Sequence, residues 1–378
     1  MKIGMVCYPT FGGSGVVATE LGIALAEKGY EVHFITYKQP VRLELLSHHI
    51  HFHEVMVPQY PLFQYQPYEL ALSSKLVNVV REHELDLLHV HYAIPHAYAG
   101  YMAKKMLEEV GIKIPMVTTL HGTDITLVGN HPFYKPAVTF SINKSDAVTS
   151  VSESLKNDTL RLFDVQREID VVPNFIDMEK HNNTFTDCQR GMMAQENERI
   201  ITHVSNLRPV KRIMDVIAVF YKIQESIPSK LIMVGEGPEK EGAEALCHKL
   251  GIADKVLFLG NSDEVNKILC FTDLFLLPSE KESFGLSALE AMASGVPVVS
   301  TNTGGLPEVN EHGISGYLNE IGDVEGMAAH ALAILKDEDT LNQFKMRARE
   351  SATKFQTENI VPLYEAVYEK ALSVASVS

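Results

Sequence analysis

The chain has 378 residues, 46% hydrophobic and 21% charged, which is typical of a globular protein long enough for two domains. Its formal net charge of −15 argues against nucleic acid as the main partner and against a basic membrane-binding surface. An anionic ligand stays compatible with that charge, because backbone donors and a few cations can reverse the potential locally.

The cysteines and the N-terminal sequence bear on the compartment. Cys7, Cys188, Cys247 and Cys270 are far apart and form no CxxC pair, so we expect reduced thiols. MKIGMVCYPTFGG becomes glycine-rich too early for a signal peptide, and no apolar run approaches the ~20 residues of a membrane span. We therefore expect a cytoplasmic protein without membrane insertion.

The first half of the chain alternates β-branched runs with amphipathic segments. A strand is predicted at 3–8 and a helix at 15–28, closed by Gly29. Further strands are predicted at 31–36, 50–57, 87–92, 116–120, 147–151 and 169–172. Helices between most of these strands predict an α/β fold with a parallel, doubly wound sheet.

The second half repeats this pattern after segment 178–198, which is polar, has no clear period and is interpreted as an interdomain linker. Strands are predicted at 200–204, 231–234, 256–259, 274–277 and 296–300. From 324 onward the pattern is helical only, ending in a helix at 360–374. We therefore predict two doubly wound domains, 1–180 and 198–357, with a ligand cleft at the carboxyl ends of their strands.

The loop GGSG at 12–15 follows the first predicted strand and opens the first helix. Such a loop can cradle a dinucleotide pyrophosphate, but the GxGxxG spacing ends on Ala18, and no acidic residue ends the second strand. A dehydrogenase is therefore one alternative, and a tight strand-to-helix turn is another.

His121 follows the strand 116–120 in the sequence HGTD. Gly122 frees the backbone to turn, so the imidazole is expected to project into the cleft and to donate to a ligand hydroxyl or carbonyl. A purely structural histidine is the alternative. Asp124 is expected to cap the next turn.

Polar residues also follow the first strand of the second domain, in SNLRPVKR. Arg208, Lys211 and Arg212, beside Asn206, lie at a helix start, where cations oppose the helix dipole, so an anion is expected between them. Gly235 lies in a flexible loop aimed at the same edge.

The sequence ESFGLSALE at 282–290 is expected to begin a helix near residue 283 or 284. Its start offers three unpaired backbone donors that suit a phosphate, the N–H groups of Phe284, Gly285 and Leu286. Glu282 and Glu290 are about two turns apart and can accept from sugar hydroxyls on either side of a diphosphate. The alternative is a helix with an acidic N-terminus.

A run of histidines, His48, His49, His51 and His53, lies in and before a predicted strand. Alternation places the last three on one face, which is a pattern that metal sites use. Glu54 is the one neighbouring carboxylate at ligand spacing, so we expect no metal.

The motifs GGSG, HGTD, VVPNFID at 171–177 and ESFGLSALE, followed by GVPVVST and GGLPE, resemble the retaining GT-B glycosyltransferases of family 4 over essentially the whole chain. Within it, HVHYAIPHA, TLHGTDITLVG and SNLRPVKR resemble a subgroup that transfers N-acetylglucosamine from UDP-GlcNAc to L-malate, the first step of bacillithiol biosynthesis. The resemblance implies a GT-B fold whose last helix, 358–378, returns to the first domain, and retention of configuration without a metal or another cofactor.

The resemblance also implies roles for single residues. Glu290 holds the ribose hydroxyls and Glu282 the sugar hydroxyls, while the amides at 284–286 and Lys211 hold the diphosphate. His121 contacts the transferred sugar, and Gly13 approaches the diphosphate from the other domain.

The chain departs from the family pattern where Gly-Arg is replaced by Ser205-Asn206, and where Phe175 follows Asn174 in place of a glycine. Arg208 is the candidate to replace that arginine. For the acceptor carboxylates, the first domain offers hydroxyl and amide donors at the ends of its strands: Ser14, Tyr92, Thr119 and Asn174. The absence of tryptophan argues against the aromatic shelf that a polysaccharide acceptor wants.

Three alternatives to malate transfer stay open. They are a family 4 transferase with a polysaccharide or lipid-linked acceptor, a UDP-sugar 2-epimerase, and a nucleotide-sugar sensor without turnover. A homodimer is compatible with the sequence.

Overall fold

A computed structural model describes residues 1–10, 12–43, 47–59, 61, 64–181, 190–262 and 264–377 of the chain. Two compact units make up the chain. Unit 1 consists of Met1–Asn174 with Glu358–Ser378, and unit 2 consists of Phe175–Thr357. Each unit is described by itself below.

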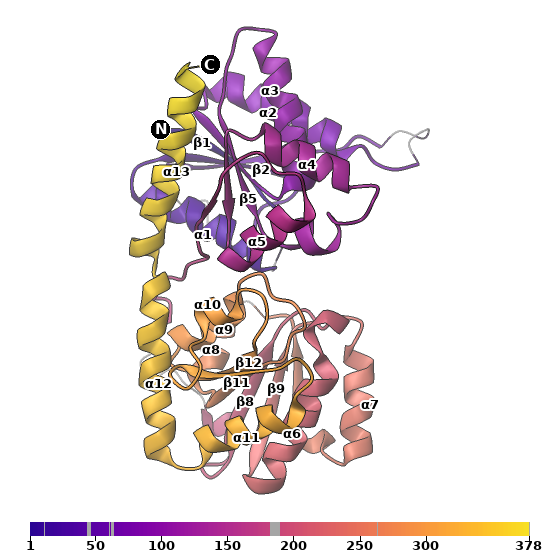
Figure 1. Ribbon diagram of the computed structural model, residues 1–378, viewed down its shortest axis with the longest axis vertical. Helices are drawn as coiled ribbons and strands as arrows, with labels where there is room; N and C mark the ends of the chain where they lie inside the picture. The colour runs from indigo at the N-terminus through magenta and orange to yellow at the C-terminus, as the bar shows by residue number, and fades with distance from the viewer. Residues whose placement is uncertain are drawn as a thin grey trace. The chain divides into compact units, whose positions relative to one another are not determined.

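Unit 1 alternates strands with helices and helical turns (Figure 1). Its strands are β1 (Lys2–Val6), β2 (Glu31–Thr36), β3 (Ile50–Glu54), β4 (Leu87–His91), β5 (Met116–Leu120), β6 (Ala147–Ser150) and β7 (Ile169–Val171). Its helices are α1 (Gly13–Glu27), α2 (Tyr68–His83), α3 (Tyr98–Glu108), α4 (Lys135–Lys144), α5 (Glu153–Leu162) and α13 (Thr357–Val377), with π-helical turns η1 (Ala93–Ala97) and η2 (Thr123–Leu127).

The seven strands form a parallel sheet in the order β3-β2-β1-β4-β5-β6-β7. The order reverses between β1 and β4, where Met5 pairs with His89. In parallel α/β sheets, ligands bind outside the carboxyl ends of the strands at such a reversal. This rule points to the segments that follow β1 and β4.

The yellow helix α13 packs on the sheet of unit 1, although it lies at the other end of the sequence (Figure 1). The Tyr368 hydroxyl is 2.8 Å from Nδ1 of the buried His89 in β4. Lys370 bonds Asp170 of β7 at 2.9 Å, and Glu365 forms an ion pair with Lys28. These bonds and the fully buried Tyr364 ring hold α13 to unit 1.

Unit 2 has six strands: β8 (Arg199–Val204), β9 (Ser229–Val234), β10 (Val256–Gly260), β11 (Leu274–Leu277), β12 (Val298–Thr301) and β13 (Gly316–Asn319). Its α-helices are α6 (Ile213–Ser226), α7 (Lys240–Leu250), α8 (Val265–Cys270), α9 (Leu286–Ala293), α10 (Leu306–Val309), α11 (Val324–Leu335) and α12 (Glu338–Ala352). Short 3-10 turns are η4 (Arg190–Met192), η5 (Pro209–Lys211), η6 (Ala253–Lys255) and η7 (Thr353–Phe355).

These strands form a second parallel sheet in the order β10-β9-β8-β11-β12-β13. The order reverses between β8 and β11, so the segments after these two strands are the counterparts of those after β1 and β4. The two parallel sheets confirm the predicted α/β class, and the strand β13 was not predicted.

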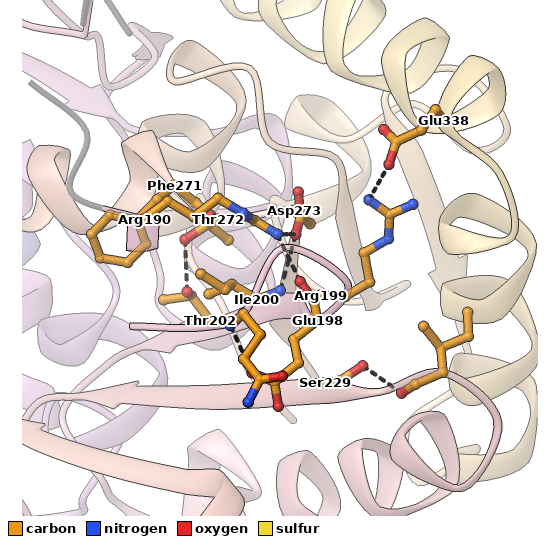
Figure 2. A network of polar contacts seen from close by, with 12 residues as sticks. Arg190, Glu198, Arg199, Ile200, Thr202, Ser229, Phe271, Thr272, Asp273 and Glu338 are labelled. Atoms are coloured by element: carbon orange, nitrogen blue, oxygen red, sulfur yellow. Dashed lines mark hydrogen bonds and ion pairs between the residues drawn. The ribbon is translucent and has the colours of Figure 1, made fainter. Parts of the chain in front are cut away.

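A polar network closes the amino ends of β8 and β11 in unit 2 (Figure 2). The buried Asp273 carboxylate accepts from Arg190 Nη2 at 2.8 Å, from the Ile200 amide at 3.0 Å and from Lys345 Nζ at 3.0 Å. Burial by itself raises the pKa of Asp273, but Lys345, the Ile200 amide and Arg190 together hold that pKa below its ordinary value. Arg190 also donates to the carbonyl oxygens of Phe271 and Glu198.

This network bears on the predicted linker 178–198. Residues 182–189 of that segment lie outside the described part of the chain. From Arg190 onward the segment is bonded to the sheet of unit 2, so this part is an integral portion of the unit.

The cysteines require a correction. Cys7 and Cys247 are free and buried, but Cys270 is disulfide-bonded, so the expectation that every thiol is reduced is wrong. Cysteine pairing depends on tertiary proximity, which the wide sequence spacing concealed. Cys188 lies outside the described residues.

Candidate active site

In unit 2, the segments after β8 and β11 meet at the reversal of the strand order. Lys211, in the turn after β8, forms an ion pair with the Glu282 carboxylate after β11. The Ser279 hydroxyl donates to the same Glu282 oxygen at 3.0 Å, and the Glu280 amide bonds the Val210 carbonyl at 2.8 Å. The side chains of Lys211 and Glu282 are 18% and 11% exposed, so both charges are largely shielded yet reachable.

Helix α9 begins at Leu286, two to three residues later than predicted, because Gly285 is left-handed (φ 102°) and ends the loop before it. Its N-cap residue is Gly285, which makes no side-chain cap bond, and the first amides of the helix are candidate donors at its positive end. Phe284 is buried and packs edge-on against Phe355 at 5.5 Å, so it can offer a ligand only its backbone.

Two glycines bring backbone segments of this region together. A Cβ at Gly304 would lie 1.8 Å from the Glu282 carbonyl oxygen, and the Gly305 amide bonds that oxygen at 2.9 Å. Gly235 has φ 126°, and a Cβ there would lie 1.8 Å from the Ser205 carbonyl oxygen. Both positions therefore require glycine, and the loops after four neighbouring strands, β8, β9, β11 and β12, are fixed to one another.

The remaining predicted residues of unit 2 lie around this pair. Asn206 and Arg208 are exposed. Glu290 lies within α9 and is half-buried. Arg212 has left-handed backbone (φ 53°) and donates to Asp215 at 2.6 Å. That bond makes Arg212 a support for the start of α6, whereas Arg208 presents its charge to solvent.

A buried histidine that the sequence analysis missed supports this region. His203 in β8 bonds the Leu276 carbonyl at 2.8 Å through Nδ1 and the Ser205 hydroxyl at 2.7 Å through Nε2. Burial lowers the pKa of His203 to about 4, so the ring is neutral at pH 7. A histidine inside the apolar run IITHV was the available signal.

In unit 1, the segments after β1 and β4 also meet where the strand order reverses. The Ser14 hydroxyl, in the first turn of α1, is 2.7 Å from the Tyr92 hydroxyl. Tyr92 has φ 86°, an uncommon value for a residue with a side chain, and its ring packs edge-on against Tyr8. Gly13 is the exposed first residue of α1, next to Ser14.

His121 lies beside this pair. Its ring is 5.1 Å from the Tyr92 ring, and its Nε2 is 2.8 Å from Nδ1 of the buried His91 in β4. Burial, followed by the field of His96, lowers the pKa of His121 to about 3, although the residue keeps part of its surface exposed. A neutral, oriented imidazole at the carboxyl edge of the sheet is the result.

Asp124 was predicted to cap the next turn, but it does not. It lies inside η2, and the residue before that turn is Gly122. Its carboxylate instead accepts from the amides of Ala93 at 2.8 Å, Gly122 at 3.0 Å and His121 at 3.2 Å. Burial raises the pKa of Asp124 to about 6 against the effect of these bonds. Asp124 thus ties the loop after β5 to the loop after β4.

Two further predicted residues are buried in unit 1. Thr119 bonds His89 Nε2 and the Thr149 hydroxyl, both at 2.7 Å, so its hydroxyl supports the row of histidines inside the sheet. This geometry does not favour direct contact between Thr119 and an acceptor. Asn174 is 6% exposed, and its Oδ1 has no hydrogen-bond partner among the described residues.

Comparisons with known proteins agree on one family. Residues 11–180 match the model of "Glycosyltransferase Family 4", and residues 189–351 match that of "Glycosyl transferases group 1". The chain is 50% identical over 374 residues, 98% of its own length and 97% of the relative's, to N-acetyl-alpha-D-glucosaminyl L-malate synthase of Bacillus anthracis. It is 26% identical over 391 residues, 96% and 82% of the two chains, to D-inositol 3-phosphate glycosyltransferase of Mycobacterium marinum.

Solved structures show the same fold. Anabaena HepE in complex with UDP and glucose has a TM-score of 0.80 at 21% identity, covering 98% of both chains. Sucrose-phosphate synthase of Thermosynechococcus elongatus has a TM-score of 0.80 at 20% identity, covering 98% of this chain and 99% of that one. Among the described residues, no helix is both long and apolar enough to span a bilayer.

Proposed function

The chain belongs to the group 1, family 4 glycosyltransferases, and from that membership we propose that it transfers N-acetylglucosamine from UDP-GlcNAc to the hydroxyl group of L-malate. A relative that is 50% identical over nearly the whole length is named N-acetyl-alpha-D-glucosaminyl L-malate synthase, which names the transferred sugar and the acceptor. The observation that carries the proposal is this identity, together with one polar cluster in each unit. Lys211 with Glu282, and Ser14 with Tyr92, lie where the strand order of their sheet reverses.

Unit 2 supplies the chemistry of a nucleotide-sugar site. The amides at the start of α9 and the Lys211 ammonium are donors that suit a diphosphate. Asn206, Arg208 and Gly235 lie on the loops around them, with Arg208 as the exposed cation. Glu282 and Glu290 place carboxylates at the two ends of segment 282–290. In the proposed complex Glu282 accepts from the sugar hydroxyls and Glu290 from the ribose hydroxyls.

Unit 1 supplies donors suited to a small dicarboxylate. Ser14 and Tyr92 share a hydrogen bond at the end of β1 and β4, and His121 lies against the Tyr92 ring. The neutral His121 imidazole can donate to a ligand oxygen without carrying a charge. Gly13 leaves the backbone of the same loop open to close approach.

The proposed reaction retains configuration and proceeds without a metal ion. The bond between the anomeric carbon and the β-phosphate oxygen breaks, and the malate oxygen forms a bond to the same face of that carbon. The leaving phosphate oxygen takes the malate hydroxyl proton, so UDP and the glycoside are the products. Lys211, the α9 amides and Arg208 stabilise the charge that develops on the phosphate.

A panel of nucleotide sugars and hydroxy acids, analysed by mass spectrometry, tests the proposal. UDP-GlcNAc with L-malate should give a product heavier than malate by one N-acetylhexosamine residue, with an α linkage by NMR. Release of UDP only with a polysaccharide or lipid acceptor would replace malate by another acceptor. Epimerised donor without any acceptor would indicate the epimerase instead, and binding of UDP-GlcNAc without turnover would indicate the sensor.

A further inference from the structure

Unit 1 contains a cluster of imidazoles that the proposed reaction does not use. We call Glu31, His33, His51, His53 and His83 the histidine cluster. His33 Nδ1 is 2.9 Å from His53 Nε2, and the His33 and His83 ring centroids are 4.7 Å apart. The Glu31 carboxylate is 3.0 Å from His33 Nε2 and 3.5 Å from His51 Nε2.

The register of two strands and the end of one helix bring this cluster together. His33 of β2 pairs with His51 of β3, and Ile35 pairs with His53, so alternation places these three histidines on one face. His83 is the last residue of α2, and its ring lies 4.9 Å from the His53 ring. His49 precedes β3 and is exposed, so the predicted face of His49, His51 and His53 is corrected to His51 and His53.

The cluster lies away from the candidate active site. Glu31 is the first residue of β2 and pairs with Lys2, the first residue of β1, whose Nζ bonds the His83 carbonyl at 2.9 Å. These contacts place Glu31 and His83 beside the amino ends of β1 and β2, and His51 and His53 lie on the edge strand β3. Ser14, Tyr92 and His121 instead follow the carboxyl ends of β1, β4 and β5. An ion bound in the histidine cluster would act on the stability of unit 1 and not on the sugar transfer.

We propose that His33, His53 and His83 bind one divalent transition-metal ion of the zinc type. One ligand atom from each of these histidines falls in a group whose members all lie within 4.8 Å of one another. Tetrahedral zinc with Zn–N bonds of about 2.0–2.1 Å needs nitrogen pairs about 3.3–3.4 Å apart. The 2.9 Å contact of His33 and His53 differs from this spacing by a few tenths of an ångström, and the ligand atom of His83 lies within 4.8 Å of those of the other two.

Glu31 completes the arrangement. When His33 donates from Nε2 to the Glu31 carboxylate, its Nδ1 keeps a lone pair that faces His53 Nε2. A ligand histidine that donates its other N–H to a carboxylate is the usual support of a zinc site. Nitrogen ligands from imidazole favour Zn²⁺, Ni²⁺ or Cu²⁺ over Mg²⁺ or Ca²⁺.

Calorimetric titration of chelator-treated full-length protein with ZnCl2 and with NiCl2 at pH 7.5 tests the proposal. One ion should bind per chain. His53→Gln and His83→Gln should each weaken binding by about 10-fold or more, and Glu31→Gln by about 10-fold, as ligand and supporting residues do in known sites. His48→Gln and His49→Gln, which change exposed members of the same sequence run, should bind as the parent does.

Other outcomes overturn the assignment. No binding to the parent, or parent-like binding by His53→Gln and His83→Gln, rejects the site. Loss of binding in His51→Gln with parent-like His53→Gln and His83→Gln assigns the ion to Glu31, His33 and His51 and rejects the proposed ligands. Should a variant fail to fold by circular dichroism, X-ray absorption of the zinc-loaded parent decides: three imidazoles support the site, and two or fewer reject it.

Discussion

At the scale of single residues, the ion pair between Lys211 and Glu282 has consequences for both side chains. In the free protein the Lys211 ammonium is already neutralised by a carboxylate that also accepts from Ser279. A diphosphate must therefore compete with Glu282 for this cation. Removing the Lys211 ammonium and removing the Glu282 carboxylate should consequently have opposite effects on the affinity for UDP.

Lys211→Met should weaken UDP binding by roughly 10- to 100-fold, because a hydrogen bond to a charged group contributes about 1.5–3 kcal/mol. Glu282→Gln should leave UDP binding unchanged or tighten it, because Lys211 is released, while turnover falls. Calorimetry with UDP and initial rates with both substrates separate the two effects. Equal loss of UDP affinity in both variants would contradict the assigned roles.

The hydrogen bond between Ser14 and Tyr92 leads to a prediction about the acceptor. Tyr92→Phe removes the hydroxyl and leaves Ser14 without this partner. The KM for malate should rise by about 5-fold, the equivalent of one ordinary hydrogen bond of about 1 kcal/mol, while the KM for UDP-GlcNAc changes less. Ser14→Ala is the matched variant from the other side of the bond. A rise confined to the donor KM would place these hydroxyls at the donor.

At the scale of secondary structure, the elements with the strongest sequence pattern were predicted best. The predicted bounds of β2, β5 and β11 are those of the structure, because each is a buried run with clear ends. The prediction missed β13, a strand of four residues, GYLN, with no apolar run to mark it. It also began α9 too early, since the left-handed backbone of Gly285 depends on its close packing with Leu306.

The candidate site shows the same limit. The rule for parallel sheets placed motif residues at strand ends, and the structure puts them at the reversals of strand order. Which side chains bond to one another was beyond that rule, because the pairs join residues far apart in sequence. Lys211 with Glu282, and His91 with His121, are contacts of this kind.

The network of Figure 2 predicts where unit 2 is sensitive to mutation. Asp273→Asn keeps the shape of the side chain but removes the charge that Arg190 and Lys345 share. We expect a loss of roughly 2–3 kcal/mol in the free energy of unfolding. This figure already allows for solvent screening of the two cations, whose side chains are about one-third exposed. Chemical denaturation measures it, and Glu338→Gln, at the exposed ion pair with Arg199, is the control with a loss below about 1 kcal/mol.

This loss should depend on pH in a defined direction. The folded state holds the pKa of Asp273 below its unfolded value, so its contribution is fully present above the unfolded value of about 4. The contribution is lost as the pH falls through the folded pKa. The difference in stability between the parent and Asp273→Asn should therefore shrink under acid, and a constant difference would contradict the assigned charge.

At the scale of the whole molecule, the buried histidines predict loss of stability in mild acid. Burial lowers the pKa of His89 to about 3 and the pKa values of His96 and His203 to about 4, against an ordinary value near 6.5. Between pH 6.5 and 4 the unfolded chain binds protons that the folded chain excludes, so stability falls as the pH falls. Asp124, whose pKa is raised to about 6, acts in the opposite direction as a single group.

Unfolding by denaturant between pH 8 and 4.5 measures this dependence. The midpoint should fall steadily below about pH 6.5, and fluorescence and circular dichroism should both be followed because two units need not unfold in one step. His203→Gln should reduce the dependence of unit 2 on pH. A midpoint that is constant from pH 6.5 to 4.5 would show that these rings are protonated in the folded protein.

Turnover and stability should respond differently to metal ions. Turnover should survive EDTA, because Lys211 and the backbone amides of α9 neutralise the leaving diphosphate in the proposed reaction. The melting temperature of zinc-loaded protein should instead fall with EDTA, since a ligand that binds only the folded state stabilises it by mass action. His53→Gln should lose the zinc-dependent part of the melting temperature and keep its turnover, because the histidine cluster lies on β2, the edge strand β3 and the end of α2, away from Ser14, Tyr92 and His121. Turnover that EDTA abolishes and Mg²⁺ or Mn²⁺ restores would reject the metal-free reaction, and a zinc-dependent melting temperature in His53→Gln equal to that of the parent would reject the histidine site.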